Sequence, residues 1–334
     1  MSDAPHDVLV LRALQLGDLL TAVPAFRAMR RAWPAATIRL IGLPWSRALV
    51  DRLPGYLDDV LPFPGWPGIP ETAFDAARTV GFLREVNRTP ADLAVQLHGS
   101  GVRTNAFIEM LGARRTAGTS VPGAHRPDAA TFVTLDEGAP EVERCLAVVE
   151  ALGVRPAGAH LELQVLDRDE HEADAVLDRA GVRGPGDRAF AIVHAGGRSA
   201  RRWPAVRFAA VADALARDLD VVLTGTDDER AVADEVVARM RRPAIDVVGA
   251  TSIGALFALA GRARVVVCND TGVSHVADAL GVPSVVLFTT SEPERWAPAD
   301  GDSHRVVRAD AARASDVIAL ARELLVSSPR GSVR

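Results

Sequence analysis

The sequence contains no lysine, so all 38 of its basic residues are arginines. Any cation that it offers to a ligand is therefore a guanidinium or a protonated histidine. Cysteine is also scarce: Cys145 and Cys268 lie far apart and form no CxxC pattern or Cys/His cluster. This spacing argues against a disulfide framework and against a zinc site, and we expect neither a metal nor a cofactor.

Long apolar runs are missing as well. No run approaches the ~18 uninterrupted apolar residues of a membrane-spanning helix, and the start, MSDAPHDVLV, lacks the basic and apolar regions of a signal peptide. The sequence therefore predicts a cytoplasmic protein. Acidic residues (43) outnumber basic ones (38), which gives a net charge of −5 and speaks against a nucleic-acid partner.

A chain of 334 residues suggests two domains. In both halves, short apolar runs such as 7–14 and 189–194 alternate with amphipathic helical patterns, which is typical of βαβ units and a parallel sheet. We predict an α/β fold with two Rossmann-like, doubly wound parallel-sheet domains and a boundary near 166–188. A short strand is expected at 161–165 and a linker helix at 167–180. Ligands of such sheets bind at the carboxyl ends of the strands, so the site should lie in a cleft between the two domains.

The strongest local pattern is Asn269-Asp-Thr-Gly-Val-Ser-His275, between a buried strand and a helix. Thr271 and Gly272 would place a hydroxyl and free backbone N–H groups at the N-terminus of that helix, which is an anion site by geometry and dipole. Taken alone, Asp270 and Thr271 could equally be ordinary helix caps, and His275 a structural histidine.

A second loop, 194–204, combines Gly196 and Gly197 with three arginines. Glycines let a backbone approach a ligand closely, and guanidinium groups suit a diphosphate, although a solvated basic loop would look the same. The loop lacks GxGxxG, so a dinucleotide fingerprint is not supported.

Three further loops carry polar groups at the ends of predicted strands. Asp18 could act as a general base or as a helix cap. The loop 98–104 offers His98, Ser100 and Arg103, the last of which could contact an anionic acceptor or be a solvated surface charge. Glu229 could hold sugar hydroxyls or complement a helix dipole.

Together these residues are similar to the heptosyltransferase family, glycosyltransferase family 9. The resemblance covers most of the chain apart from 54–90 and 119–140. It rests on GDLLTAVPAFRAMRRAWP, DLAVQLHGS, RTNAFIEMLGARRTAG, HAGGRSARRWPAVRFAAVADAL, VVLTGTDDERAVADEV, CNDTGVSHVADALGVPSVVLF and EPERWAP, in the family's order and spacing.

The resemblance implies a GT-B architecture, in which two Rossmann-like domains face each other across a cleft. Residues 1–166 would bind the acceptor and 185–308 the nucleotide-sugar, while a C-terminal helix at 309–326 would pack back on the first domain. Asp18 matches the family's catalytic base. The implied donor-binding residues are Gly196, Gly197, Arg201, Glu229, Asp270, Thr271, Gly272 and His275; the acceptor-binding residues that we expect are Gly17, His98, Ser100 and Arg103.

Two departures from the family pattern bear on the donor site. Arg201 stands where the family usually has a lysine that holds the leaving phosphate, which keeps the charge but changes the geometry of its N–H donors. Phe288-Thr-Thr-Ser replaces a frequent Gly-Pro pair near the nucleotide.

The resemblance implies an inverting, metal-independent transfer of a sugar, with a heptose as one candidate, from a nucleotide-sugar to an acceptor hydroxyl. An ADP-linked donor is favoured, and the acceptor would be a glycan, a glycolipid or a small molecule. A lipid-linked acceptor would bring the protein to the inner face of the membrane. The alternative is a non-catalytic or epimerase-like nucleotide-sugar-binding protein of the same fold.

Overall fold

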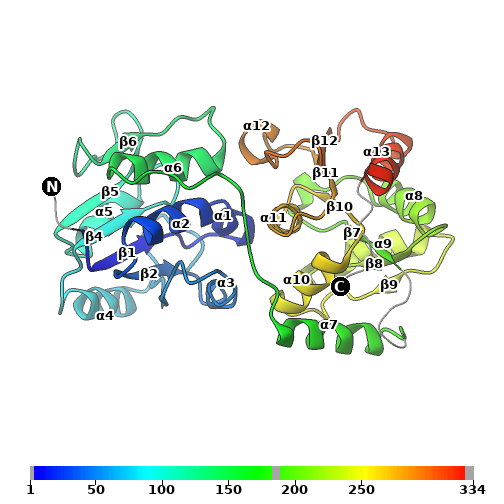
Figure 1. Ribbon diagram of the computed structural model, residues 1–334, viewed down its shortest axis with the longest axis horizontal. Coiled ribbons are helices and arrows are strands. Elements are labelled where there is room, and N and C mark those ends of the chain that lie inside the picture. Colours follow the sequence, from blue (N-terminus) through cyan, green and yellow to red (C-terminus); the bar gives the residue numbers. More distant parts are fainter. Residues whose placement is uncertain (1–3, 183–188, 328–334) are drawn as a thin grey trace. The chain divides into compact units, whose positions relative to one another are not determined.

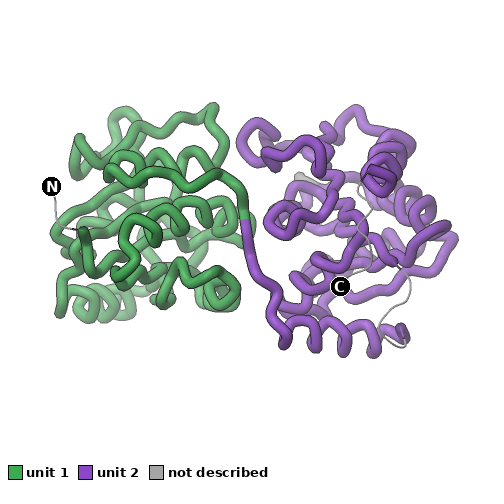
Figure 2. Tube along the Cα trace, viewed as in Figure 1, with its two compact units in different colours: residues 1–161 green, residues 162–334 purple. Residues whose placement is uncertain are grey.

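The computed structural model describes residues 4–182 and 189–327 and divides into two compact units, Met1–Leu161 and Glu162–Arg334 (Figure 2). Each unit is a six-stranded parallel sheet with helices packed around it (Figure 1). This confirms the predicted α/β class with two doubly wound domains.

The first unit is built from alternating strands and helices. Its strands are β1 (Asp7–Leu11), β2 (Thr37–Gly42), β3 (Asp59–Pro62), β4 (Leu93–Gln96), β5 (Arg115–Ser120) and β6 (Phe132–Thr134). Its helices are α1 (Leu16–Leu20), α2 (Val23–Ala32), α3 (Ser46–Val50), α4 (Ala76–Val86), α5 (Thr104–Met110) and α6 (Glu141–Ala151). The sheet order is β3-β2-β1-β4-β5-β6.

The second unit repeats this plan. Its strands are β7 (Phe190–His194), β8 (Asp220–Leu223), β9 (Ile245–Asp246), β10 (Val265–Asn269), β11 (Ser284–Phe288) and β12 (His304–Arg308). Its α-helices are α7 (Asp167–Arg179), α8 (Ala205–Leu215), α9 (Arg230–Arg239), α10 (Ile253–Arg262), α11 (Gly272–Ala279), α12 (Pro293–Trp296) and α13 (Ala314–Ser327). Two 3-10 turns, Ser199–Arg201 and Asp227–Glu229, precede α8 and α9.

The strand order of each sheet creates one topological switch point. In the second sheet, β12-β11-β10-β7-β8-β9, the chain runs outward from β7 in one direction and then outward from β10 in the other. In the first sheet, β1 and β4 are the corresponding neighbours. Loops diverge above the carboxyl ends of such a strand pair and leave a crevice, which is where ligands bind in sheets of this kind.

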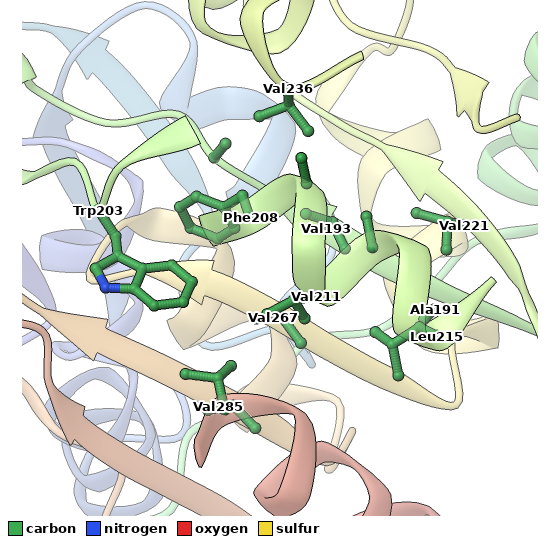
Figure 3. Packing of buried hydrophobic residues seen from close by; sticks show 14 of the residues in the cluster. Ala191, Val193, Trp203, Phe208, Val211, Leu215, Val221, Val236, Val267 and Val285 are labelled. Atoms are coloured by element: carbon green, nitrogen blue, oxygen red, sulfur yellow. The ribbon is translucent and has the colours of Figure 1, made fainter. Parts of the chain in front are cut away.

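Apolar strands form the centre of each unit because parallel strands are buried on both faces. Val8, Leu9, Val10 and Leu11 of β1 have no exposed surface. In the second unit, Val193, Val267 and Val285 lie with Trp203 and Phe208 in one buried cluster (Figure 3). The Trp203 and Phe208 rings meet edge to face at 5.3 Å between centroids.

The C-terminal helix packs differently from the sequence-based expectation. We expected a helix at 309–326 to return to the first domain, but α13 packs on α8, β10 and β11 of the second unit. Val317, Ala321 and Leu324 of α13 are fully buried in the core cluster of that unit. The physical reason is that this apolar face lies beside α8 in one core cluster and covers β10 and β11.

The boundary between the units also differs from the expected 166–188. The predicted linker helix is present as α7, but it packs on α10 and belongs to the second unit, which begins at Glu162. Ala173, Val176 and Leu177 supply its buried face. Residues 161–165 form no strand, and the segment 119–140, which the family resemblance does not cover, contains the end of β5 and all of β6.

Within the described residues, no helix is both long and apolar enough to cross a lipid bilayer.

Candidate active site

The first candidate loop follows β1 and carries Asp18 in the short helix α1. Asp18 is half-buried, and Gly17 beside it is buried. The main chain of Asp18 is held from both sides, since the side chains of Arg12 and Thr21 donate hydrogen bonds to its carbonyl oxygen. Within the described part of the chain, no hydrogen bond engages the Asp18 carboxylate itself, so its oxygens are available to a substrate.

Arg12 is the anchor of this loop. It is 1% exposed and follows directly on β1. Besides the Asp18 carbonyl, its guanidinium donates to the carbonyl of Leu97, to Thr21 Oγ1 at 3.1 Å and to Glu141 Oε1 at 3.1 Å. A planar guanidinium with five N–H donors can hold several chain segments at once, so Arg12 joins the β1 loop, the end of β4 and the start of α6.

His98 brings the second candidate loop to the first. It follows β4 and is buried, and its Nδ1 accepts a hydrogen bond from the backbone N–H of Ala13 at 3.2 Å. Burial, with the charge of Arg12 as a second cause, lowers the pKa of His98 to about 3. The ring is therefore neutral at physiological pH and, because Nδ1 accepts, carries its proton on Nε2 as a donor.

A buried polar network shapes the loop after His98. The Gln96 amide donates to the carbonyl of His98 at 2.9 Å and its Oε1 accepts from Thr119. Thr119 Oγ1 donates to the carbonyl of Gly99 at 2.6 Å. Gly101 has φ +82°, and a Cβ there would lie 2.2 Å from the carbonyl oxygen of Thr119, so the loop requires glycine at this position.

The remaining predicted acceptor residues lie on the same loop with different exposure. Ser100 is half-buried. Arg103 is exposed, and its aliphatic stem lies against Gly68, where a Cβ would come 3.0 Å from Arg103 Cδ. The structure thus brings Gly17, His98 and Ser100 to the switch point of the first sheet, with Arg103 at its rim.

In the second unit, Asn269 ties the two predicted donor loops together. It ends β10 with no exposed surface, and its Nδ2 donates to the carbonyls of Ala195 (3.1 Å) and Gly196 (2.8 Å). Its Oδ1 accepts the backbone N–H of Trp203 at 3.0 Å. All three side-chain bonds of one amide therefore hold the loop after β7 against the end of β10.

The N-terminus of α11 has the geometry of an anion site. Thr271 is the N-cap, and Gly272 and Val273 begin the helix, where the first backbone N–H groups have no partner within the helix. Thr271 Oγ1 is buried and has no hydrogen-bond partner among the described residues. Gly197 has φ +115°, and a Cβ there would lie 2.9 Å from Thr271 Cγ2, so both predicted loops border this helix end.

Glu229 has a role that its position in the sequence did not reveal. Its Oε1 accepts the backbone N–H of Gly197, and its Oε2 accepts that of Thr226 at 2.9 Å. Burial raises its pKa, but His194, with Nε2 at 3.8 Å from Oε2, and the two N–H groups outweigh burial and leave the pKa lowered. Glu229 is thus an ionised carboxylate that holds the glycine loop in place.

The other predicted donor residues are distributed around the helix end. Asp270 is buried before Thr271, and His275 is buried one turn into α11, with its ring edge to face with Trp296 at 6.3 Å. Arg201 ends a 3-10 turn, but its side chain lies outside the described part of the structure. In the described ranges, no group of three or more His, Cys, Asp or Glu side chains could hold a metal ion.

The anchoring roles that sequence reasoning missed share one signal. Arg12, Gln96, His194 and Asn269 are polar residues at or just after the last position of an otherwise apolar strand. A buried strand ends in a polar side chain only where that side chain finds partners, so each of these positions marks a loop that must be anchored.

We expect Gly196→Ala to lower the free energy of unfolding by about 1–3 kcal/mol, because the new methyl group would lie 2.3–2.4 Å from the Glu229 carboxylate and displace this half-buried ion from its N–H donors. Gly81→Ala is the control. Gly81 lies in α4 with open space around its Cβ position, so that exchange should stabilise by up to about 1 kcal/mol. Urea unfolding of both variants measures the difference, and equal changes would contradict the tight packing at Gly196.

Comparison with known proteins identifies the family. The profile of glycosyltransferase family 9 (heptosyltransferase) matches residues 81–322, more than half of the chain. Lipopolysaccharide heptosyltransferase 2 of Salmonella typhimurium is 25% identical over 312 residues, which cover 90% of this chain and 87% of the relative.

Solved structures show the same fold. A family 9 glycosyl transferase from Veillonella parvula superposes with a TM-score of 0.80 at 22% identity over 97% of this chain and 98% of that one. The Escherichia coli ADP-heptose lps heptosyltransferase II gives 0.78 at 21% identity, over 96% of this chain and 99% of that one. The resemblance read from the sequence motifs is thereby confirmed: the chain belongs to glycosyltransferase family 9 (heptosyltransferase) and is a glycosyltransferase with the GT-B fold.

Proposed function

We propose that the protein transfers a heptose from ADP-heptose to a hydroxyl group of a glycan acceptor, with inversion at the anomeric carbon and without a metal ion. Family membership supports sugar transfer. The choice of donor draws on the names of two relatives, an ADP-heptose lps heptosyltransferase and a lipopolysaccharide heptosyltransferase.

The observation that carries the proposal is the pair of anchored switch points. In the first unit, Arg12 holds the main chain of Asp18 while the carboxylate stays available. In the second unit, Asn269 and Glu229 hold two glycines beside the start of α11. A base held in one place and an anion site held in another are the two groups that a nucleotide-sugar transfer requires.

Asp18 is the proposed general base. Its carboxylate takes the proton of the acceptor hydroxyl as that oxygen attacks the anomeric carbon from the face opposite the leaving group. The bond from the anomeric carbon to the diphosphate oxygen breaks as the new glycosidic bond forms, so the configuration inverts. The reaction requires the acceptor hydroxyl to reach both the Asp18 carboxylate and the anomeric carbon of the donor when both substrates are bound.

The leaving ADP gains negative charge as that bond breaks. We assign its diphosphate to the backbone N–H groups at the start of α11, to Thr271 Oγ1 and to Arg201. The dipole of α11 and the N–H groups stabilise an anion at this helix end, and the Thr271 hydroxyl, buried without a partner, gains a hydrogen bond when a phosphate oxygen arrives. These groups stabilise the charge that a metal ion neutralises in other transferases.

A thermal-shift panel tests the donor. We expect ADP to raise the unfolding temperature more than GDP, UDP or dTDP, since a ligand at about 100 times its Kd stabilises the native state by roughly 2.7 kcal/mol. ADP-heptose should then support transfer at an unchanged rate in EDTA, with the product anomer established by NMR. A larger shift with another nucleotide, or a rate abolished by EDTA, would refute the corresponding part of the proposal.

Thr271→Val separates binding from folding. The exchange keeps the shape but removes a buried hydroxyl that has no partner in the described structure, so the unfolding temperature of the free protein should not fall. ADP affinity should fall roughly 10- to 100-fold, because one hydrogen bond to a charged oxygen is lost. Calorimetric titration with ADP measures this loss, and an unchanged Kd would remove Thr271 from the donor site.

A further inference from the structure

The first unit contains a cavity beside the proposed acceptor loops. It has a volume of about 380 Å³ and lies between α6 and the carboxyl ends of β5 and β6, elements that pack against one another (Figure 1). This volume is within the range of roughly 300–1,000 Å³ typical of small-molecule sites. We call it the α6 pocket.

One face of α6 forms a wall of the pocket. Glu143, Leu146, Ala147 and Glu150 are spaced i, i+3, i+4 and i+7, so they project from the same side of the helix. Leu146 is buried and Ala147 half-buried, whereas both glutamates are exposed at the rim. This face therefore offers an apolar surface bordered by two carboxylates.

The opposite wall of the pocket also combines an apolar side chain with exposed polar ones. It comes from the end of β6 and the residues after it, where Leu135 is half-buried and Thr134 and Asp136 are exposed. The pocket thus has an apolar interior and a rim of hydroxyl and carboxylate groups.

The charge of the pocket is negative. Arg144 also lines it, but the Arg144 guanidinium is engaged: Nε donates to the carbonyl of Ala139 at 3.0 Å, and NH1 lies 3.7 Å from Glu141 Oε2. The three rim carboxylates, Asp136, Glu143 and Glu150, are therefore not neutralised by the arginine that shares the pocket.

The pocket walls are held by the same side chains that hold the proposed acceptor loops. Thr119 lines the pocket, and its Oγ1 donates to the carbonyl of Gly99 in the His98 loop. On the other wall, α6 begins at Glu141, which is paired with Arg12, the anchor of the Asp18 main chain. The α6 pocket is thus joined through direct contacts to both loops.

We propose that the α6 pocket binds a sugar unit of the acceptor that carries no phosphate, and binds it most tightly when that unit bears an ammonium group. The C–H face of a sugar ring packs on apolar side chains, and its hydroxyls donate to carboxylates. An ammonium group adds attraction to the rim, while a phosphate would meet like charges. This inference rests on the proposed function and specifies its acceptor.

The test compares three probes with the same ring: glucosamine, glucose and glucose 6-phosphate. Their Kd values for the full chain are measured by ligand-observed NMR titration at low ionic strength. Because an exposed charge pair contributes up to about 1 kcal/mol, we expect glucosamine to bind about 5-fold more tightly than glucose 6-phosphate. Absence of glucosamine binding, or a preference for glucose 6-phosphate, would overturn the proposal.

Charge reversal locates the binding. Glu143→Arg combined with Glu150→Arg should invert the order, so that glucose 6-phosphate binds more tightly than glucosamine. Glu85→Arg combined with Glu235→Arg makes the same change of charge at exposed helical glutamates outside the pocket and should leave the order unchanged. Inversion in both double variants, or in neither, would show that the probes bind elsewhere and would overturn the proposal.

The inference and the proposed function can fail separately. If the Glu143→Arg/Glu150→Arg variant leaves the order of the probe affinities unchanged while loss of the Asp18 carboxylate abolishes transfer, the pocket assignment is wrong and the catalytic proposal stands. If the order inverts as expected but transfer survives without that carboxylate, the pocket is a sugar site and the base has been assigned wrongly.

Discussion

Asp18→Asn is expected to lower the turnover of sugar transfer by roughly 10²- to 10⁴-fold, the usual contribution of a general base. The amide is nearly the same size as the carboxylate but cannot accept the acceptor proton. The main chain should keep its place, because Arg12 and Thr21 hold the carbonyl oxygen of residue 18 rather than its side chain. Single-turnover kinetics with ADP-heptose and acceptor measure the loss.

Binding measurements distinguish this effect from misfolding. The Kd for ADP should stay within about twofold of the parent, since the donor groups that we assign lie on the second unit. Asp218→Asn, at an exposed position between α8 and β8, is the control and should retain full turnover. Turnover of Asp18→Asn within threefold of the parent would show that another group accepts the proton.

Asn269→Asp is expected to lower the free energy of unfolding by about 3–5 kcal/mol at neutral pH. The Asn269 amide donates to two carbonyl oxygens at a site with no exposed surface. A carboxylate there would still accept the backbone N–H of Trp203, but it would be buried opposite both carbonyls with no hydrogen to donate to them. Urea unfolding of parent and variant measures the loss.

The loss should depend on pH in a defined direction. Burial beside two carbonyls raises the pKa of the new carboxyl in the folded state above its unfolded value of about 3.9. The difference in stability from the parent should therefore be smallest below about pH 4, grow as pH rises towards the folded pKa and then level off.

Asn87→Asp is a matched control for this exchange. The Asn87 amide also donates to two carbonyls, those of Leu83 and Met110, but Asn87 is exposed. Water can solvate a carboxylate there, so we expect a loss below about 1 kcal/mol. Equal losses at positions 87 and 269, or a loss at 269 that does not change with pH, would contradict the role assigned to Asn269.

The strands next to each switch point were predictable because their sequences leave few alternatives. Runs such as Phe190–His194 and Val265–Asn269 are apolar on both faces, which suits a strand covered by helices on both sides. The loops after them were predictable as ligand sites because glycine, threonine and aspartate stand where a strand turns into a helix. The edge strands β3 and β12 were not foreseen, since an edge strand is short or partly exposed and lacks a continuous apolar run.

The sequence of an amphipathic helix did not show which part of the protein the helix packs against. The apolar faces of α7 and α13 showed that each must pack on something, but not on which domain. Both pack within the second unit, on α10 and on α8 with its neighbouring strands. The packing partner of each helix depends on where another element leaves apolar surface uncovered. The periodicity of the helix sequence gives no information about that surface.

The sequence alone determined the parallel α/β class, the family and the types of residue that stand at the ends of the central strands. The tertiary structure decided which side chains hold the site together. Arg12 and Glu141 are 129 positions apart, and Asn269 reaches Gly196 across 73. Periodicity and turn composition act over a few residues, whereas a buried hydrogen bond exists only where folding brings a donor and an acceptor to one place, so partners this distant are defined by the packing of the whole unit.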